Sequence, residues 1–134
     1  MKELDIRTVS TAGLAYLGDA VIELLTRERL LAAGYASAKS LNAHARDYVT
    51  APAQAAAMER ILPLLTEQEE AIFRRGRNIG HTNTPKHATV AEYRAATGME
   101  ALFGYLHLVG DEARAKALFS AAYPPEEETE VTDT

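Results

Sequence analysis

The sequence predicts an all-α protein, and three features of the 134-residue chain lead to this prediction. Apolar residues recur at helical spacing along nearly the whole chain, whereas no segment alternates apolar and polar residues as a half-buried strand would. No segment repeats with a period of about 20 to 50 residues, which argues against a repeat protein. The hydrophobic content of 47% is enough for one core in a chain of this length. We therefore expect a single domain of about seven helices.

The first two helices are predicted from the caps that flank them. A long helix should run from about residue 11 to 33, with Ser10 or Thr11 as its N-cap. Gly34 should end this helix, because glycine readily adopts the left-handed conformation of a C-cap. The second helix is expected over residues 38–49.

Prolines and a capping box mark the third and fourth helices. Pro52 suits the first turn of a third helix, because the missing amide hydrogen is not needed there. Pro63 breaks that helix. The fourth begins at Thr66, whose spacing from Glu69 is typical of a capping box, and it ends near Gly76.

Three further helices are expected after a loop over residues 76–88. Thr89 and Glu92 have capping-box spacing and should open a fifth helix. Thr97 should restart the pattern as a sixth helix. Asp111 should cap a seventh helix, which ends before the two prolines at 124 and 125.

The negative net charge of the chain comes from its C-terminal tail. The chain has 19 acidic and 14 basic residues, a net charge of −5. Five of the acids lie close together near the end, namely Glu126, Glu127, Glu128, Glu130 and Asp133. The rest of the chain is therefore balanced. We expect residues 1–123 to form the domain and residues 124–134 to be a disordered acidic tail.

The chain lacks the features of secreted and membrane proteins. It contains no cysteine, which excludes disulfides and thiolate zinc sites. No apolar run reaches the roughly 18 residues of a membrane span, and the N-terminus has no apolar signal core. We expect a cytoplasmic protein.

Asp19 is the first candidate functional residue, because it lies among small residues within an apolar helical segment. Helical spacing places one apolar stripe along Leu14, Leu17, Val21, Leu24 and Leu25. The opposite face should carry Asp19, with Tyr16 one turn back and Glu23 one turn on. Small neighbours allow a backbone, another subunit or a ligand to approach the carboxylate closely. The alternative is an ordinary solvated face, on which Glu23 pairs with Arg27 rather than completing an outer shell.

Glu100 is the second candidate, because it also lies within an apolar helical run. Gly104, one turn beyond, leaves a gap over its side chain. The alternative is a capping box, in which Glu100 only reaches back to the amide of Thr97. Two carboxylates on separate buried helices could instead hold a magnesium ion for phosphodiester hydrolysis.

The stretch between Glu70 and Glu92 contains no acidic residue and is basic. It contains Arg74, Arg75, Arg77, Lys86, His81 and His87. Such a local excess of positive charge is typical of a phosphate-binding surface, although a solvated loop is an equal alternative. A zinc site at the two histidines is only weakly indicated, because the chain offers no cysteine to complete it.

These segments resemble a known family. Leu-Ala-Tyr-Leu-Gly-Asp-Ala-Val at 14–21 and Met-Glu-Ala-Leu-Phe-Gly-Tyr-Leu at 99–106 resemble the two signature segments of the ribonuclease III catalytic domain. The similarity is strongest to its small bacterial branch, the Mini-III ribonucleases. Arg-Arg-Gly-Arg-Asn at 74–78, followed by His81, Thr82, Pro85 and Lys86, is similar to the basic loop of that branch. The resemblance covers roughly residues 12–120.

The resemblance implies a ribonuclease III-like endonuclease domain that cleaves double-stranded RNA with Mg²⁺ and leaves 5′-phosphate and 3′-hydroxyl ends. It assigns metal binding and catalysis to Asp19 and Glu100. Larger members carry two further carboxylates, at the positions of Ala15 and Thr97. Their absence is also the habit of the small branch, and it leaves a second metal site open.

The resemblance also implies partners. Tyr16 should insert into a second subunit of a homodimer, although a tyrosine lying flat on its own surface is the alternative. The expected substrate is the precursor of large-subunit ribosomal RNA. The expected RNA-binding residues are Arg74, Arg75, Arg77, Asn78, His81 and Lys86. The alternative function is a non-catalytic helical adaptor that binds RNA or docks a protein.

Overall fold

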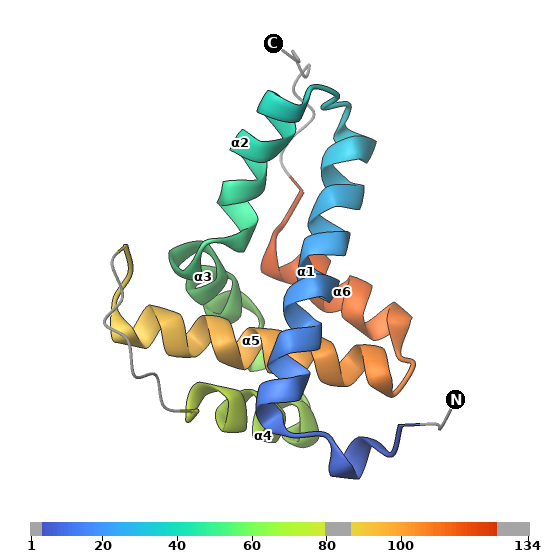
Figure 1. Cartoon of the computed structure of the whole chain (residues 1–134), viewed down its shortest axis with the longest axis vertical. Coiled ribbons are helices and arrows are strands. Elements are labelled where there is room, and N and C mark those ends of the chain that lie inside the picture. Colours follow the sequence, from blue (N-terminus) through green and yellow to red (C-terminus); the bar gives the residue numbers. More distant parts are fainter. Residues whose placement is uncertain (1–3, 80–86, 126–134) are drawn as a thin grey trace.

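The computed structural model describes residues 4–79 and 87–125 of the chain, and its fold is all-α (Figure 1). The described residues form α1 (Thr11–Ala33), α2 (Ala38–Val49), α3 (Ala51–Ile61), α4 (Glu67–Arg77), α5 (Val90–Leu108) and α6 (Glu112–Ala122), with 3₁₀ turns η1 (Ile6–Thr8) and η2 (Leu62–Leu64). None of the described segments is a strand, which confirms the predicted class. No described helix has the length and apolar character needed to cross a membrane.

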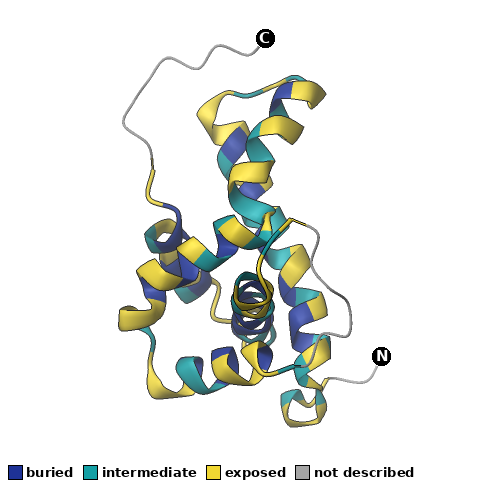
Figure 2. Ribbon diagram, turned by 90° about the vertical axis from the view of Figure 1, so that its left-hand side faces the viewer, coloured by how far each residue is buried: buried dark blue, intermediate teal, exposed yellow. Residues whose placement is uncertain are grey.

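Helix α5 lies at the centre of the fold. Helix α1 crosses it, and α3 and α4 also pack against it (Figure 1). Figure 2 looks along α5 and shows the other helices around it, with its buried residues facing them. Met99, Leu102 and Phe103 of α5 are fully buried. Each such side chain stabilises the fold by about 1.5–3 kcal/mol through removal of apolar surface from water.

The helix ends follow the predicted caps. Ser10 Oγ accepts a hydrogen bond from Gly13 N at 2.9 Å and so begins α1. Gly34 ends α1 in the left-handed region, with φ of 103°. Complete capping boxes begin α4 at Thr66 and Glu69 and α5 at Thr89 and Glu92. These bonds satisfy amide groups that have no partner within the helix.

The prediction that Thr97 starts a sixth helix is wrong, because α5 continues through it. The Thr97 hydroxyl donates to Tyr93 O at 3.0 Å, a bond to the preceding turn that is compatible with a helix interior. The glycine at position 98 does not mark a helix end. It leaves room for Phe73 of α4, which packs on it. A Cβ atom at Gly98 would lie 2.6 Å from Phe73 Cδ1.

The buried face of α1 also differs from the predicted apolar stripe. The buried positions include Leu14, Gly18, Ile22, Thr26 and Leu30, which follow one another at intervals of four. Leu24 of the predicted stripe is 57% exposed. A pattern of large apolar residues misses this face because Gly18 contributes a close backbone contact instead of a side chain. Asp19 therefore lies beside the buried face rather than opposite it.

A largely buried ion pair joins α6 to the start of α4. The guanidinium of Arg114 donates to Glu69 twice, from Nε to Oε2 at 2.9 Å and from Nη2 to Oε1 at 2.8 Å. It also donates to Leu64 O at 2.9 Å. The hydrogen bonds from Arg114 hold the pKa of Glu69 below its usual value. Such a bidentate pair fixes the angle at which α6 leaves the core.

Candidate active site

Two glycines let α1 and α5 touch through their backbones. A Cβ atom at Gly18 would overlap the carbonyl group of Glu100 and would lie 2.8 Å from Gly104 N. A Cβ atom at Gly104 would likewise overlap Leu14 O. The prediction that small residues around Asp19 allow a backbone to approach is confirmed. The approaching backbone belongs to α5 of the same chain.

This crossing brings the carboxyl groups of Asp19 and Glu100 together. Asp19 is exposed, whereas Glu100 is partly buried. The pKa of Glu100 is raised to about 8, first by burial, then by the negative charge of Asp19 and by a hydrogen bond between the two side chains. Burial disfavours the charged carboxylate, and a like charge nearby disfavours it further. The two carboxyl groups therefore share a proton near neutral pH. A bound cation could replace this proton.

The capping-box alternative for Glu100 is excluded in this fold. Thr97 is an internal residue of α5, and its hydroxyl donates to Tyr93 O. The N-cap of this helix is Thr89, which is paired with Glu92. Glu100 thus caps no helix, and its carboxyl group faces Asp19.

The chemistry of the pair fits a hard divalent cation. Mg²⁺ is bound in proteins by one or two carboxylates and retains several waters. Among residues 4–79 and 87–125, no group of three or more His, Cys, Asp or Glu side chains is placed to hold a metal. Asp19 and Glu100 would therefore be the ligands supplied by this part of the chain. Ala15 is buried against the core, and Thr97 offers only a hydroxyl that is already bonded.

Glu23 is engaged with a neighbour on its own helix. Arg27 Nη2 lies 3.0 Å from Glu23 Oε1, an ion pair one turn apart. This supports the reading of Glu23 as a partner of Arg27 on the surface rather than as part of an outer metal shell. Exposed pairs of this kind contribute little to stability.

The candidate RNA-binding residues divide into those at the end of α4 and those that lie outside the described residues. Arg74, Arg75 and Arg77 are exposed in the last turn of α4, and Asn78 ends that helix. Arg74 Nη2 pairs with Glu70 Oε1 at 2.7 Å, and the Arg77 guanidinium lies 5.8 Å from the Phe73 ring centroid. His81, Thr82, Pro85 and Lys86 lie outside the described residues, as does one histidine of the weakly indicated zinc site.

The last turn of α4 packs on the first half of α5, a contact that the sequence analysis missed. A Cβ atom at Gly76 would lie 2.7 Å from Gly98 Cα and 3.0 Å from Thr97 O. A glycine within each of the two helical runs, Gly76 and Gly98, was the signal for this contact, although Gly76 predicted only a helix end and Thr97 only a new helix start. This contact places the arginines of α4 near the turn of α5 that precedes Glu100.

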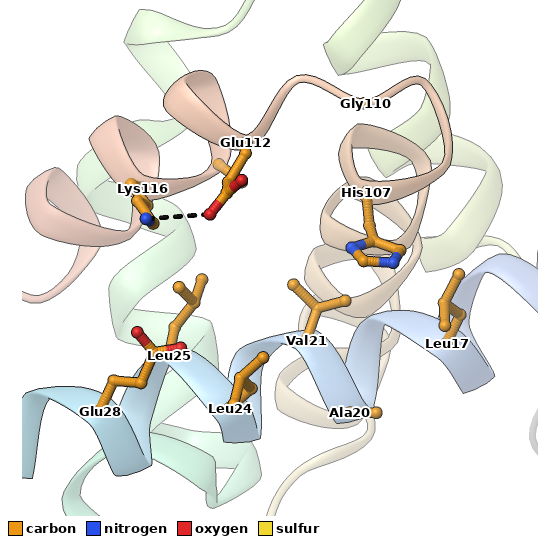
Figure 3. A pocket seen from close by; sticks show the side chains of 11 residues that line it. Leu17, Ala20, Val21, Leu24, Leu25, Glu28, His107, Gly110, Glu112 and Lys116 are labelled. Atoms are coloured by element: carbon orange, nitrogen blue, oxygen red, sulfur yellow. Dashed lines mark ion pairs between the residues drawn. The ribbon is translucent and has the colours of Figure 1, made fainter.

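Tyr16 is an exposed residue of α1, and the residue after it, Leu17, lines an apolar groove. The Tyr16 side chain is 85% exposed. Leu17, Ala20, Val21 and Leu24 of α1 line one side of a groove of about 440 Å³ (Figure 3). Residues of α5, α6 and the corner between them line the other side, among them His107, Gly110 and Lys116, whose Nζ pairs with Glu112 Oε1 at 3.0 Å. Tyr16 does not lie against the protein's own surface as the alternative reading required.

An all-α domain with two facing carboxylates on its crossing helices agrees with the family comparison. Residues 12–111 match the family described as Ribonuclease III domain. The chain therefore belongs to the ribonuclease III family, and both carboxylates lie within the matched residues. This confirms the resemblance seen in the sequence and makes the chain a ribonuclease III family endoribonuclease.

Relatives of this chain carry a more specific name. The Mini-ribonuclease 3 of Symbiobacterium thermophilum is 50% identical over 115 residues, which cover 86% of this chain and 88% of the relative. The Mini-ribonuclease 3 of Enterococcus faecalis is 40% identical over 87% of this chain and 89% of the relative. A crystal structure of a Fusobacterium nucleatum protein has a TM-score of 0.78 and 35% identity, over 87% of this chain and 93% of that chain.

Proposed function

We propose that this protein is a Mg²⁺-dependent endoribonuclease that cleaves double-stranded RNA. The observation that carries the proposal is the Asp19–Glu100 pair, formed where α1 and α5 cross in a chain of the ribonuclease III family. A non-catalytic adaptor would have no need for a carboxyl group whose pKa is raised by burial and by a second acid.

Asp19 and Glu100 hold the cation, and their charge is used in binding it rather than in proton transfer. When bound, Mg²⁺ makes a coordinated water more acidic and stabilises the leaving oxygen. The close backbone contact at Gly18 and Gly104 sets the separation of the two carboxylates. Because that contact is made by backbone rather than by flexible side chains, the pair is held rigidly before substrate binds. The proposed products have 5′-phosphate and 3′-hydroxyl ends.

Recognition of the duplex rests on its backbone. A-form RNA presents phosphates and 2′-hydroxyls in a wide minor groove and hides the informative base edges in a narrow one. Arg75 and Arg77 are exposed in the last turn of α4 and suit phosphate contacts. Arg74, Asn78, His81 and Lys86 complete the proposed surface, with Arg74 already paired to Glu70.

A homodimer would supply one site for each strand of the duplex. An exposed tyrosine that precedes a residue of an apolar groove supports this assembly, because a two-fold axis can place Tyr16 of each copy against the partner. The interface proposed here includes Leu24, which is apolar and also exposed. The resemblance to the small branch supports precursors of large-subunit ribosomal RNA as the substrate and the cytoplasm as the location.

Incubation of the pure protein with matched duplex and single-stranded RNA, with and without Mg²⁺, tests the proposal. We expect cleavage of the duplex only, and only with Mg²⁺. Binding of the duplex without cleavage under all divalent cations would favour the adaptor. Cleavage of single-stranded RNA at an equal rate, or full activity in EDTA, would overturn the proposal.

A further inference from the structure

We infer that Arg94 contacts a backbone phosphate of the strand that is cut and so positions that strand over Asp19 and Glu100. Arg94 is an exposed residue of α5 and belongs to none of the segments that indicated the family. The inference rests on the proposed function and adds a substrate contact to it.

Arg94, Thr97 and Glu100 form one line on the surface of α5. Residues three apart on a helix are neighbours, and the row is diagonal, because each step of three places the next residue about 60° further around α5. The rise of about 1.5 Å per residue separates Arg94 from Glu100 by roughly 9 Å along the helix axis. An arginine side chain can therefore reach a phosphate close to the one held at the carboxylates.

The packing of α4 makes this line the bridge between the two proposed parts of the site. Gly76 of α4 touches α5 at Thr97 O and Gly98, in the middle of the line. Figure 1 shows the C-terminal end of α4 beneath the first half of α5. A strand that extends from the Asp19–Glu100 pair toward the arginines of α4 would therefore pass Thr97, and Arg94 is the next residue of this row beyond Thr97.

The charges around Arg94 leave it available for an anion. The acid two residues before it, Glu92, accepts a hydrogen bond from Thr89 N at 2.8 Å as part of the capping box. Glu70 of α4 is paired with Arg74. Across the described parts of the chain, Arg94 makes no ion pair within 4.0 Å. A guanidinium offers parallel donors that match two oxygens of one phosphate, which a lysine cannot reproduce.

The sequence alone did not single out this residue. The acid-free stretch that indicates a basic surface ends at Glu92, and Arg94 lies just beyond it. Only the structure shows that Glu92 turns back to cap its own helix and that the last turn of α4 packs on α5 at Thr97 and Gly98.

A chemical double-mutant cycle tests the inference with the full chain. The proteins are the wild type, Arg94→Ala, Arg94→Lys and the control Lys39→Ala, which removes one exposed cation from the start of α2 at the far end of the molecule (Figure 1). The substrates are one duplex and a series in which a single phosphate near the cleavage site is a neutral methylphosphonate. Each methylphosphonate follows a 2′-deoxynucleotide, and the same deoxynucleotide with a normal phosphate is its reference. The readout is kcat/KM, with circular dichroism melts to confirm folding.

We expect Arg94→Ala to lower kcat/KM on the unmodified duplex by about tenfold or more, as loss of a charge-assisted hydrogen bond would, and Lys39→Ala to change it less than twofold. At one or two phosphate positions, the methylphosphonate should lower the wild-type value by a similar factor and leave Arg94→Ala unaffected. Such non-additivity would identify the phosphate that Arg94 contacts. Arg94→Lys should recover part of the loss, at the same positions.

Three outcomes would contradict the inference. One is an Arg94→Ala protein as active as Lys39→Ala. Another is an Arg94→Ala protein that is impaired yet as sensitive as the wild type to every methylphosphonate, since Arg94 would then act without touching the phosphates. If Arg94→Ala fails to fold, kcat/KM of Arg94→Lys on the methylphosphonate substrates is used instead. The contact is contradicted if each methylphosphonate lowers kcat/KM of Arg94→Lys by the same factor as that of the wild type. A wild type that cuts no unmodified duplex overturns the proposed function, and this inference with it.

Discussion

Gly18 of α1 lies against the carbonyl group of Glu100 on α5, so closely that a single methyl group at Gly18 would overlap it. The residue after Gly18 is Asp19, and the side chain of Glu100 faces it. The same close contact that packs the two central helices thus also assembles the pair of carboxylates. Stability and the proposed activity therefore depend on one backbone crossing.

Gly18→Ala should destabilise the protein by about 3 kcal/mol, because the added methyl group must push two backbones apart. It should also lower cleavage by separating the carboxylates. Gly13→Ala on the same helix is the control, since its Cβ would meet only side-chain atoms, Ser10 Oγ at 3.1 Å and Val9 Cγ1 at 3.3 Å, which need to shift by only a few tenths of an ångström, and we expect a change within about 1 kcal/mol. Urea denaturation measures both, and equal effects would contradict the contact.

Asp19→Asn and Glu100→Gln should each lower kcat/KM by about a hundredfold or more, since each removes charge from the proposed metal site without changing volume. Glu23→Gln, which alters an acid already paired with Arg27, should remain close to the wild type. Melting curves should show that all three variants fold. An unfolded Glu100→Gln protein whose refolded fraction cuts normally would mean that Glu100 is structural.

The metal-free protein should lose stability as pH rises between about 4.5 and 8. The pKa of Glu100 is raised to about 8 in the folded state from an ordinary value near 4.5, so the folded protein binds more protons in this window. Its contribution to stability is complete below about pH 4.5 and is lost as pH approaches 8. Urea denaturation in EDTA at pH 5, 6.5 and 8 measures the trend.

Two comparisons test whether Glu100 causes this pH dependence of stability. Glu100→Gln should flatten the pH dependence, because glutamine does not titrate. Mg²⁺ should raise the melting temperature more at pH 8 than at pH 6, since its binding must displace the proton of Glu100. An unchanged pH slope in Glu100→Gln would show that another group titrates.

Tyr16→Ala should weaken the proposed dimer by about 2 kcal/mol or more, because truncation of a central aromatic anchor commonly costs this much. Activity should fall most at low protein concentration. Leu64→Ala removes another exposed apolar side chain, 52% exposed on η2, and should leave assembly unchanged. Sedimentation measures the oligomeric state of each protein. A wild type that is monomeric and fully active would show that Tyr16 belongs to no interface needed for activity.

Arg75→Ala and Arg77→Ala should weaken all duplexes alike, because both arginines are placed to contact phosphates rather than bases. Each change should flatten the dependence of log affinity on log salt by about one unit or less. Arg74→Ala should have a smaller effect, since Arg74 is paired with Glu70. Loss of one duplex sequence but not another, with an unchanged salt slope, would indicate base recognition instead.

The sequence by itself determined the helix ends and both candidate carboxylates. Ser10, Gly34 and Thr66 cap their helices as predicted, because a cap depends only on residues within one turn of it. Asp19 and Glu100 were visible because a charge within an apolar helical run is unusual. The bounds of α1 and α2 agree with the predicted ranges.

The tertiary structure alone decided which faces meet. It made α5 one helix through Thr97, buried Gly18 rather than Leu24, and packed the end of α4 on Thr97 and Gly98 of α5. A glycine lies at each of these contacts, and a glycine within a helix can be taken for a break although it also permits the closest backbone contact. Which of the two applies depends on a partner helix far away in the chain, and local spacing carries no information about that partner.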